Sequence, residues 1–229
     1  MEFQSIVQNI AIFSVPFVMA VVLHEVAHGW VANRFGDSTA QRAGRITLNP
    51  LPHLDLIGTV ILPLFMLISQ SPILFGWARP VPINPQSFSN YRKGLFWVSL
   101  AGPAMNFILA IFGAFAFVAL QKWVPENFIL YVPLSLMAYT TVALNFVLGL
   151  FNLIPLPPLD GSKMLESFLG HKGTQWLRTV ERYSFYILIA LLMTGVLRVI
   201  FYPVHLLTFS SIHLAASLLG LQNLVLPQF

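Results

Sequence analysis

The sequence contains no cysteine among its 229 residues and has few charged residues. Without cysteine, a disulfide framework and a thiolate metal site are both excluded, so any metal must be held by His, Asp, Glu or Asn. Only 9% of the residues are charged, against about a quarter in ordinary soluble domains, and 57% are hydrophobic. A soluble chain this apolar has too little polar surface to stay dispersed. The composition therefore predicts a polytopic membrane protein surrounded by the lipid bilayer.

The sequence also lacks any run of basic residues, although its formal net charge is +4. In a membrane protein, a modest excess of Lys and Arg is typical of loops on the cytoplasmic side. We therefore expect no nucleic-acid partner, a multi-pass location in the cell membrane, and an N-terminus outside. The cytoplasmic side is predicted to carry Arg34, Arg42, Arg45, Arg92, Lys93, Lys163, Lys172, Arg178 and Arg182.

Long stretches without Asp, Glu, Lys or Arg indicate the membrane spans. Each is at least as long as the roughly 20 residues that a spanning helix needs, and they cover residues 3–24, 94–121, 127–159 and 199–229. With helix-ending residues taken into account, we predict spans at about 6–33, 95–120, 130–154 and 183–202. The part after Pro203 forms either a final span or an interfacial segment.

Three segments between the first two spans do not follow the pattern of a spanning helix. Residues 44–50 predict a short strand, because β-branched residues stand between Gly and Pro. Residues 56–69 are apolar but of marginal length, and form either a short span or a re-entrant helix. A re-entrant helix fits the cytoplasmic basic loops, unless residues 76–85 return across the membrane. The three prolines of residues 76–85 exclude a helix or a central strand and leave an extended edge or loop.

The chemistry of the chain is concentrated in the motif His24-Glu25-Val26-Ala27-His28, inside the first predicted span. On a helix, residues four apart project from one face, so both imidazoles can reach one Zn²⁺ ion. Glu25 then lies beside the metal, where it can take a proton from bound water and pass it to a leaving amine. The alternative is a pair of core histidines beside a neutral Glu. We favour the metal site, because ionisable clusters inside a membrane are usually functional.

A catalytic zinc needs a third protein ligand and one position left for water. The charged residues close to apolar sequence are few, namely Asp55, Asp160 and Arg198. Asp160 lies in a predicted helix break at 152–161, where prolines remove amide donors and the last glycine permits a positive φ. An unwound part of a span can turn its side chains to a wet cavity. The same stretch is equally compatible with a helix end and a surface Asp, and Asp55 and His53 remain open as ligands.

Together the two stretches resemble the site-2 protease family of intramembrane zinc metalloproteases. The resemblance covers about residues 15–161, with His-Glu-x-x-His on an early span and Asn-x-x-Pro-x-Pro-x-Leu-Asp-Gly on a later one. It includes Gly102, Asn106 and Ala110, which are similar to the Gly-x-x-x-Asn-x-x-x-Ala pattern of the family's middle core helix. The chain has no inserted PDZ or CBS domain, and in this it resembles the compact bacterial and archaeal branch.

The resemblance implies a fold and a set of site residues. The expected fold is an all-α polytopic membrane protein, with a three-span zinc-binding core, flanking spans, and short membrane-associated β-strand or re-entrant segments. One Zn²⁺ per chain would be held by His24, His28 and Asp160. Glu25 would be the general base, and Asn152 would help to hold the substrate or polarise its carbonyl.

We expect residues 1–229 to form one intramembrane metalloprotease domain, with a core at about 6–170 and accessory C-terminal spans at about 183–229. It would hydrolyse peptide bonds in or near the transmembrane segments of protein or peptide substrates. Such a segment must unwind, because an intact helix covers its peptide bonds. An extended edge at 44–49 or 81–84 is a candidate for holding it, and water would enter from the cytoplasmic side. The alternatives are a metal-ion transporter and a catalytically inactive membrane scaffold.

Other polar residues have more than one interpretation. Asn106 either supports the site or bonds across packed helices, and we favour packing. His53 and Asp55 could order a turn, gate the site or bind metal, and a structural role in a turn is favoured.

Overall fold

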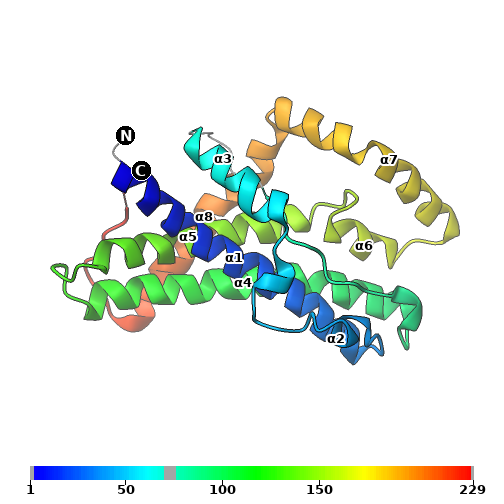
Figure 1. The fold of residues 1–229 in the computed structure, drawn as a ribbon, viewed down its shortest axis with the longest axis horizontal. Coiled ribbons are helices and arrows are strands. Elements are labelled where there is room, and N and C mark those ends of the chain that lie inside the picture. The colour runs from blue at the N-terminus through cyan, green and yellow to red at the C-terminus, as the bar shows by residue number, and fades with distance from the viewer. Residues whose placement is uncertain (1–2, 70–75, 228–229) are drawn as a thin grey trace.

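The computed structural model describes residues 3–69 and 76–227, and every regular element in these two ranges is a helix (Figure 1). Within residues 3–69 and 76–227, four helices are long and apolar enough to cross a membrane. They are α1 (Phe3–Arg34), α4 (Tyr91–Trp123), α5 (Tyr131–Asn152) and α8 (Val196–Leu219). The predicted all-α polytopic membrane fold is therefore confirmed.

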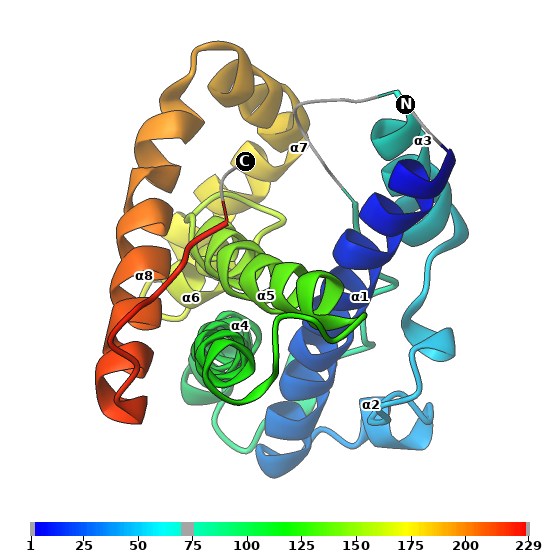
Figure 2. The same cartoon turned by 90° about the vertical axis from the view of Figure 1, so that its left-hand side faces the viewer.

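The helices α4 and α5 run antiparallel through the molecule (Figure 1). The helices α1 and α8 lie on opposite sides of this pair (Figure 2). The end of α1, the start of α4 and the helix α6 lie at the same end of the molecule (Figure 1). The shorter elements are α2 (Thr39–Arg42), η1 (Leu51–His53), η2 (Leu56–Ile61), α3 (Leu62–Ile68), η3 (Pro85–Ser87), α6 (Asp160–Glu166) and α7 (His171–Met193).

Small side chains bring α4, α5 and α8 close together. Ala110 and Ala114 of α4 are buried with Ala215 of α8 in one apolar cluster, which also contains Phe117. At Gly113, a Cβ atom would lie only 3.1 Å from side-chain carbons of α5. Helices in lipid gain little from hydrophobic exclusion of water, so their association depends on this kind of close packing.

An extended segment, residues 79–84, is attached to the end of α1 through Asp37. After α1, the chain turns at Gly36, which has a φ of 100°. Asp37 accepts a hydrogen bond from Thr39 N at 3.0 Å and one from Asn84 N at 2.6 Å. Burial raises the pKa of Asp37, but the hydrogen bonds from Thr39 and Asn84 outweigh it and lower the pKa below its ordinary value. The prediction of an extended loop at 76–85 is confirmed for this segment.

The predicted strand at 44–50 is wrong. Gly44 has a φ of 65°, and Arg45 N donates to Ala40 O at 2.9 Å, which closes the turn after α2. Asn49 N then donates to the Thr47 hydroxyl at 3.2 Å, and Leu51 N donates to the Asn49 side chain at 3.1 Å. These local bonds use the backbone donors that a strand would need for a partner.

The segment predicted at 56–69 forms η2 and α3, which together run from Leu56 to Ile68. This helix is shorter than the roughly 20 residues of a full span, so its re-entrant path stays a prediction. The span predicted at 183–202 is wrong. Gly195, with a φ of 73°, separates α7 from α8, and the candidate span of α8 is Phe201–Leu219. After Pro203, the residues up to Leu219 therefore belong to a candidate span.

We expect Asp37→Asn to weaken the protein, because Thr39 N and Asn84 N donate to different oxygens of the carboxylate. An amide has only one oxygen, so it can accept only one of these two hydrogen bonds. The loss should be about 1–3 kcal/mol of unfolding free energy. Since the pKa of Asp37 is lowered in the folded state, the contribution is present above the ordinary pKa and disappears as the pH falls through the folded-state pKa. Thermal unfolding in detergent at neutral and acidic pH measures both effects, with Glu126→Gln in an exposed loop as control. A neutral-pH loss no larger than that of the control would contradict this interpretation.

Candidate metal centre

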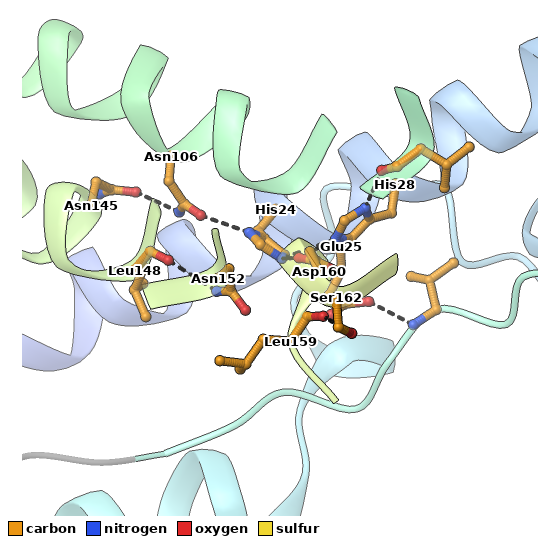
Figure 3. Close-up of polar contacts among 12 residues, drawn as sticks. His24, Glu25, His28, Asn106, Asn145, Leu148, Asn152, Leu159, Asp160 and Ser162 are labelled. Atoms are coloured by element: carbon orange, nitrogen blue, oxygen red, sulfur yellow. Dashed lines mark hydrogen bonds and ion pairs between the residues drawn. The ribbon is translucent and has the colours of Figure 1, made fainter. Parts of the chain in front are cut away.

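The helix α1 carries His24 and His28 one turn apart on the face that packs against α4. Their rings meet edge to face, with centroids 4.6 Å apart and an angle of 84° between planes. The two Nε2 atoms are 3.0 Å apart. Both residues are buried, exposing 9% and 6% of their surface. The spacing that the sequence predicted on a helix therefore does bring two imidazole nitrogens to one point (Figure 3).

Asp160 supplies a third atom at the same point. Its Oδ2 lies 3.2 Å from Nε2 of His24 and 3.2 Å from Nε2 of His28. It is the first residue of α6, which begins directly after the proline-rich break that follows α5. Among the residues that the structure describes, these three side chains are the group of His, Asp or Glu residues arranged to hold a metal ion.

Gly161 fixes the position of Asp160 through a lack of space, and not through its φ. A Cβ atom there would collide with the carbonyl oxygen of Leu153 and lie 2.5 Å from that of Ile154. Its φ is not positive, so the predicted reason for glycine at this position was wrong. The start of α6 is thus pressed against the backbone at the end of α5, and this contact holds the carboxylate towards α1.

A chain of hydrogen bonds leads from His24 through α4 into α5 (Figure 3). His24 Nδ1 donates to Asn106 Oδ1 at 2.6 Å, and Asn106 Nδ2 donates to Asn145 Oδ1 at 2.8 Å. Asn145 Nδ2 donates to the carbonyl of Thr141 at 2.9 Å. Because a backbone carbonyl can only accept, it sets the orientation of both amides, and Nδ1 of His24 must carry the proton.

His28 is also held by a hydrogen bond from its Nδ1 atom, in this case to a backbone carbonyl. Its Nδ1 donates to the carbonyl oxygen of Val98 at 2.6 Å. In a neutral imidazole with a protonated Nδ1, the Nε2 atom carries a lone pair. When both rings are neutral, the Nε2 lone pairs of His24 and His28 therefore face each other and a carboxylate oxygen of Asp160.

This donor set fits a zinc ion. Zinc binds His nitrogen and carboxylate oxygen at about 2.0–2.2 Å in a tetrahedral geometry, which places ligand atoms about 3.3 Å apart. The observed separations are 3.0, 3.2 and 3.2 Å. Three electron-rich atoms this close repel one another unless a cation lies among them, and hydrogen bonds from the far ring nitrogens are the usual support for metal-bound histidine.

Glu25 lies beside this cluster and is held by the extended segment. Its Oε2 accepts a hydrogen bond from Val81 N at 2.6 Å. No hydrogen bond to its second oxygen, Oε1, is found among the described residues. That oxygen remains available to accept a proton.

Asn152, at the last position of α5, is near the cluster but does not touch the three ligand atoms. Its Nδ2 donates to the carbonyl of Leu148 at 3.0 Å (Figure 3). An amide NH₂ group has two hydrogens, so one N–H is still available for a substrate carbonyl. The role predicted for Asn152 stays a prediction.

The structure also shows the contacts of Asn106, Asp55 and His53, the polar residues with more than one interpretation. Asn106 bonds across helices to Asn145, as the favoured packing interpretation predicted, and it also bonds to His24, as the alternative interpretation predicted. Asp55 accepts hydrogen bonds from Ile57 N and Gly58 N at the start of η2, which confirms its role in a turn. His53 is fully buried, and its Nε2 donates to Thr47 O at 3.1 Å.

Two contacts of the centre were not anticipated, those of Asn145 and of Val81. Asn145 is one of the few amides in an otherwise apolar span, and this was the available signal. The Val81 contact is made by its backbone N–H, so the type of residue at position 81 could not predict it.

Gly102 of α4 explains how the helices come so close. A Cβ atom on Gly102 would collide with Nε2 of His28 and lie 2.5 Å from Nε2 of His24. The backbone of α4 thus forms one wall of the cluster, and no side chain larger than hydrogen leaves room for both rings.

Comparison with known proteins points to one group. The pattern of peptidase family M50 matches residues 127–195, a range that includes Asp160. The protein named "Putative zinc metalloprotease YwhC" from Bacillus subtilis (strain 168) is 36% identical over 198 residues, which cover 82% of this chain and 83% of that protein.

More distant relatives carry similar names. "Putative zinc metalloprotease Rip2" from Mycolicibacterium smegmatis is 30% identical, over 79% of this chain and 66% of that protein. "Zinc metalloprotease MJ0392" from Methanocaldococcus jannaschii is 28% identical over 73% of this chain, but only 38% of that protein is matched. No solved structure matches the chain.

We expect Gly102→Ala to expel the metal, because the added methyl group occupies the space of the two imidazole rings. Zinc content per chain, measured by atomic absorption on detergent-purified protein, should fall well below that of the parent. The matched control is Gly113→Ala on the same helix, where a Cβ meets its neighbours at 3.1 Å and needs shifts of only a few tenths of an ångström. Full zinc content in Gly102→Ala would contradict the described approach of α4.

We expect Asn106→Leu to weaken zinc binding by about 10- to 100-fold, because the Nδ1–H of His24 loses its acceptor. Competition with a chromophoric chelator measures the affinity. The control is Met105→Leu, at the preceding position of α4. It introduces the same residue outside the hydrogen-bond chain and should bind zinc like the parent. An unchanged affinity in Asn106→Leu would show that the amide chain does not support the metal.

Proposed function

The chain belongs to peptidase family M50, the site-2 protease family of zinc metalloproteases, and we propose that it hydrolyses peptide bonds in or near the transmembrane segments of other membrane proteins. The protein is a multi-pass membrane enzyme, and the part of the chain that the structure describes contains four candidate spans. The observation that carries the proposal is the convergence of His24, His28 and Asp160 on one point beside Glu25, with both histidines on a helix that is itself a candidate span.

We assign His24, His28 and Asp160 as the ligands of one zinc ion. When bound, zinc supplies a Lewis acid that lowers the pKa of water and polarises a carbonyl. In this assignment Asn106 and the carbonyl of Val98 hold the two rings with Nε2 towards the metal. Residues 1–229 would act as one domain, since α8 shares its apolar cluster with α4 and α5.

Glu25 is proposed as the general base. Its Oε1 would take the proton of the attacking water and deliver it to the amine that leaves the peptide bond. The Val81 N–H holds the other oxygen at 2.6 Å and so fixes the plane of the carboxylate. The free N–H of Asn152 would donate to the carbonyl of the substrate.

The substrate segment must reach the site in an extended form. The segment at 79–84 already lies extended beside Glu25, while the alternative at 44–49 contains a turn. Pro80 and Pro82 have no N–H, so at these positions the segment can only accept hydrogen bonds from a substrate. The extended conformation of 79–84 favours this segment over 44–49 as the edge that holds the unwound substrate.

The active site is proposed to lie nearer the cytoplasmic side. Asp160 begins α6, and the following helix, α7, carries Lys172, Arg178 and Arg182. The end of α1 and the start of α4, at the same end of the molecule, add further basic residues (Figure 1). Basic residues of this kind mark the cytoplasmic face.

The test is Glu25→Gln in purified protein with a model transmembrane substrate. We expect zinc content equal to that of the parent and cleavage reduced by about 10²- to 10⁴-fold, because the amide cannot take the proton. Removal of zinc by a chelator should abolish cleavage by the parent, and added zinc should restore it.

Glu181→Gln, on the exposed face of α7, is the charge-matched control and should cleave like the parent. Cleavage retained in Glu25→Gln would disprove the assigned base. Zinc flux into vesicles without any cleavage by the parent would disprove the proposed function.

A further inference from the structure

The extended segment at 79–84 is attached to the rest of the protein at closely spaced backbone atoms. Arg45 Nη2 donates to the carbonyl of Arg79 at 2.6 Å, and Arg79 N donates to His53 O at 2.8 Å. Val81 N donates to Glu25 at 2.6 Å, and Asn84 N donates to Asp37 at 2.6 Å. The segment is therefore a fixed element that connects Arg45 on one side to Glu25 on the other.

Arg45 is an unusual residue for a surface loop. It exposes only 9% of its surface, and among the described residues it forms no ion pair with a carboxylate. Its Nε atom is buried without a hydrogen-bond partner. Burial and the charge of Arg79 lower the pKa of Arg45, and the charge of Glu25 opposes them. A guanidinium this enclosed is costly to bury, and the hydrogen bond that it makes goes to the segment that holds Glu25.

The covalent geometry between the two contacts is short and stiff. The Arg79 carbonyl carbon is bonded to the nitrogen of Pro80, and the Val81 nitrogen is bonded to the carbonyl carbon of Pro80. With planar peptide bonds, only φ and ψ of Pro80 lie between the carbonyl held by Arg45 and the N–H that holds Glu25. The proline ring fixes φ near −65°. One rotatable bond therefore separates the two contacts.

We infer that Arg45 is a positioning residue for Glu25. By holding the Arg79 carbonyl, Arg45 sets the direction of the Val81 N–H, and this N–H sets the orientation of the Glu25 carboxylate. The expected effect of Arg45 on cleavage rests on the proposed role of Glu25 as base. The expected effect of Arg45 on the orientation of the Glu25 carboxylate does not rest on that role, because the Val81–Glu25 hydrogen bond can be observed without any reaction.

The first test reads the hydrogen bond itself in zinc-free protein labelled with ¹⁵N-valine. A short bond to a carboxylate should move the Val81 amide proton downfield, and Glu25→Gln should reduce that shift. We expect Arg45→Gln to reduce it as well, although Arg45 does not touch Val81. Arg42→Gln, an equal charge change on exposed α2, should leave it in place. An unmoved Val81 signal in Arg45→Gln would overturn the inference, whatever the enzyme cleaves.

The second test reads catalysis. We expect Arg45→Gln to keep its zinc and its KM within about threefold, and to lose about 10- to 100-fold in kcat, because small displacements of a catalytic group are costly. Arg45→Lys keeps a donor and should recover part of the loss. Replacing the Val81 amide by an ester, through incorporation of the α-hydroxy acid, removes the N–H alone and should lower kcat to a similar extent.

Combining Arg45→Gln with the Val81 ester distinguishes a positioning role of Arg45 from a general structural role. If Arg45 acts through the Val81 N–H, Arg45→Gln in the ester protein should cause little further loss of kcat. Fully additive losses, or a loss of zinc in parallel with kcat, would overturn the inference. If Arg45→Gln does not fold, Arg45→Lys and the ester protein decide in the same way. If Glu25→Gln still cleaves, the assignment of Glu25 as base fails, and if the parent does not cleave, the proposed function fails. In both cases the valine signal continues to test the position of the carboxylate.

Discussion

Polar groups buried among apolar helices must satisfy one another, because neither lipid nor bulk water can do so. This requirement organises the centre of the molecule. The buried Nδ1–H of His24 is satisfied by Asn106, whose own amide is satisfied by Asn145, and the series ends on the carbonyl of Thr141. The chain links α1, α4 and α5, so the positions of three helices and the orientation of one metal-binding ring are determined together.

These hydrogen bonds between helices also require the helices to lie close together. Small residues let α4 approach its neighbours, and Gly102 is the place where this approach reaches the imidazole rings. Gly161 has the corresponding function for α6, which rests on the backbone at the end of α5. The metal centre is thus formed between backbones in contact, and the glycines are as necessary to it as the side chains that would bind the ion.

The parts of the site that could be predicted depend on local geometry. A spacing of four residues on a helix places His24 and His28 on one face, and prolines mark the break from which Asp160 projects. The parts that could not be predicted depend on distant contacts or on competition between neighbours. Val81 and Glu25 are 56 positions apart and meet through a backbone atom. The strand expected at 44–50 failed because its backbone and side chains form turns, and one glycine divided the span expected at 183–202.

The order of donors and acceptors in the amide chain has an electrostatic consequence. In each of its three hydrogen bonds, the donor is on the side of His24 and the acceptor is on the side of α5. The amide dipoles of Asn106 and Asn145 are therefore aligned, and each has its oxygen, the negative end, towards the histidine. In a medium of low dielectric constant, aligned dipoles strengthen one another. The bundle thereby offers a stabilising field to a cation at the His24 ring through neutral side chains, without the cost of burying another charge.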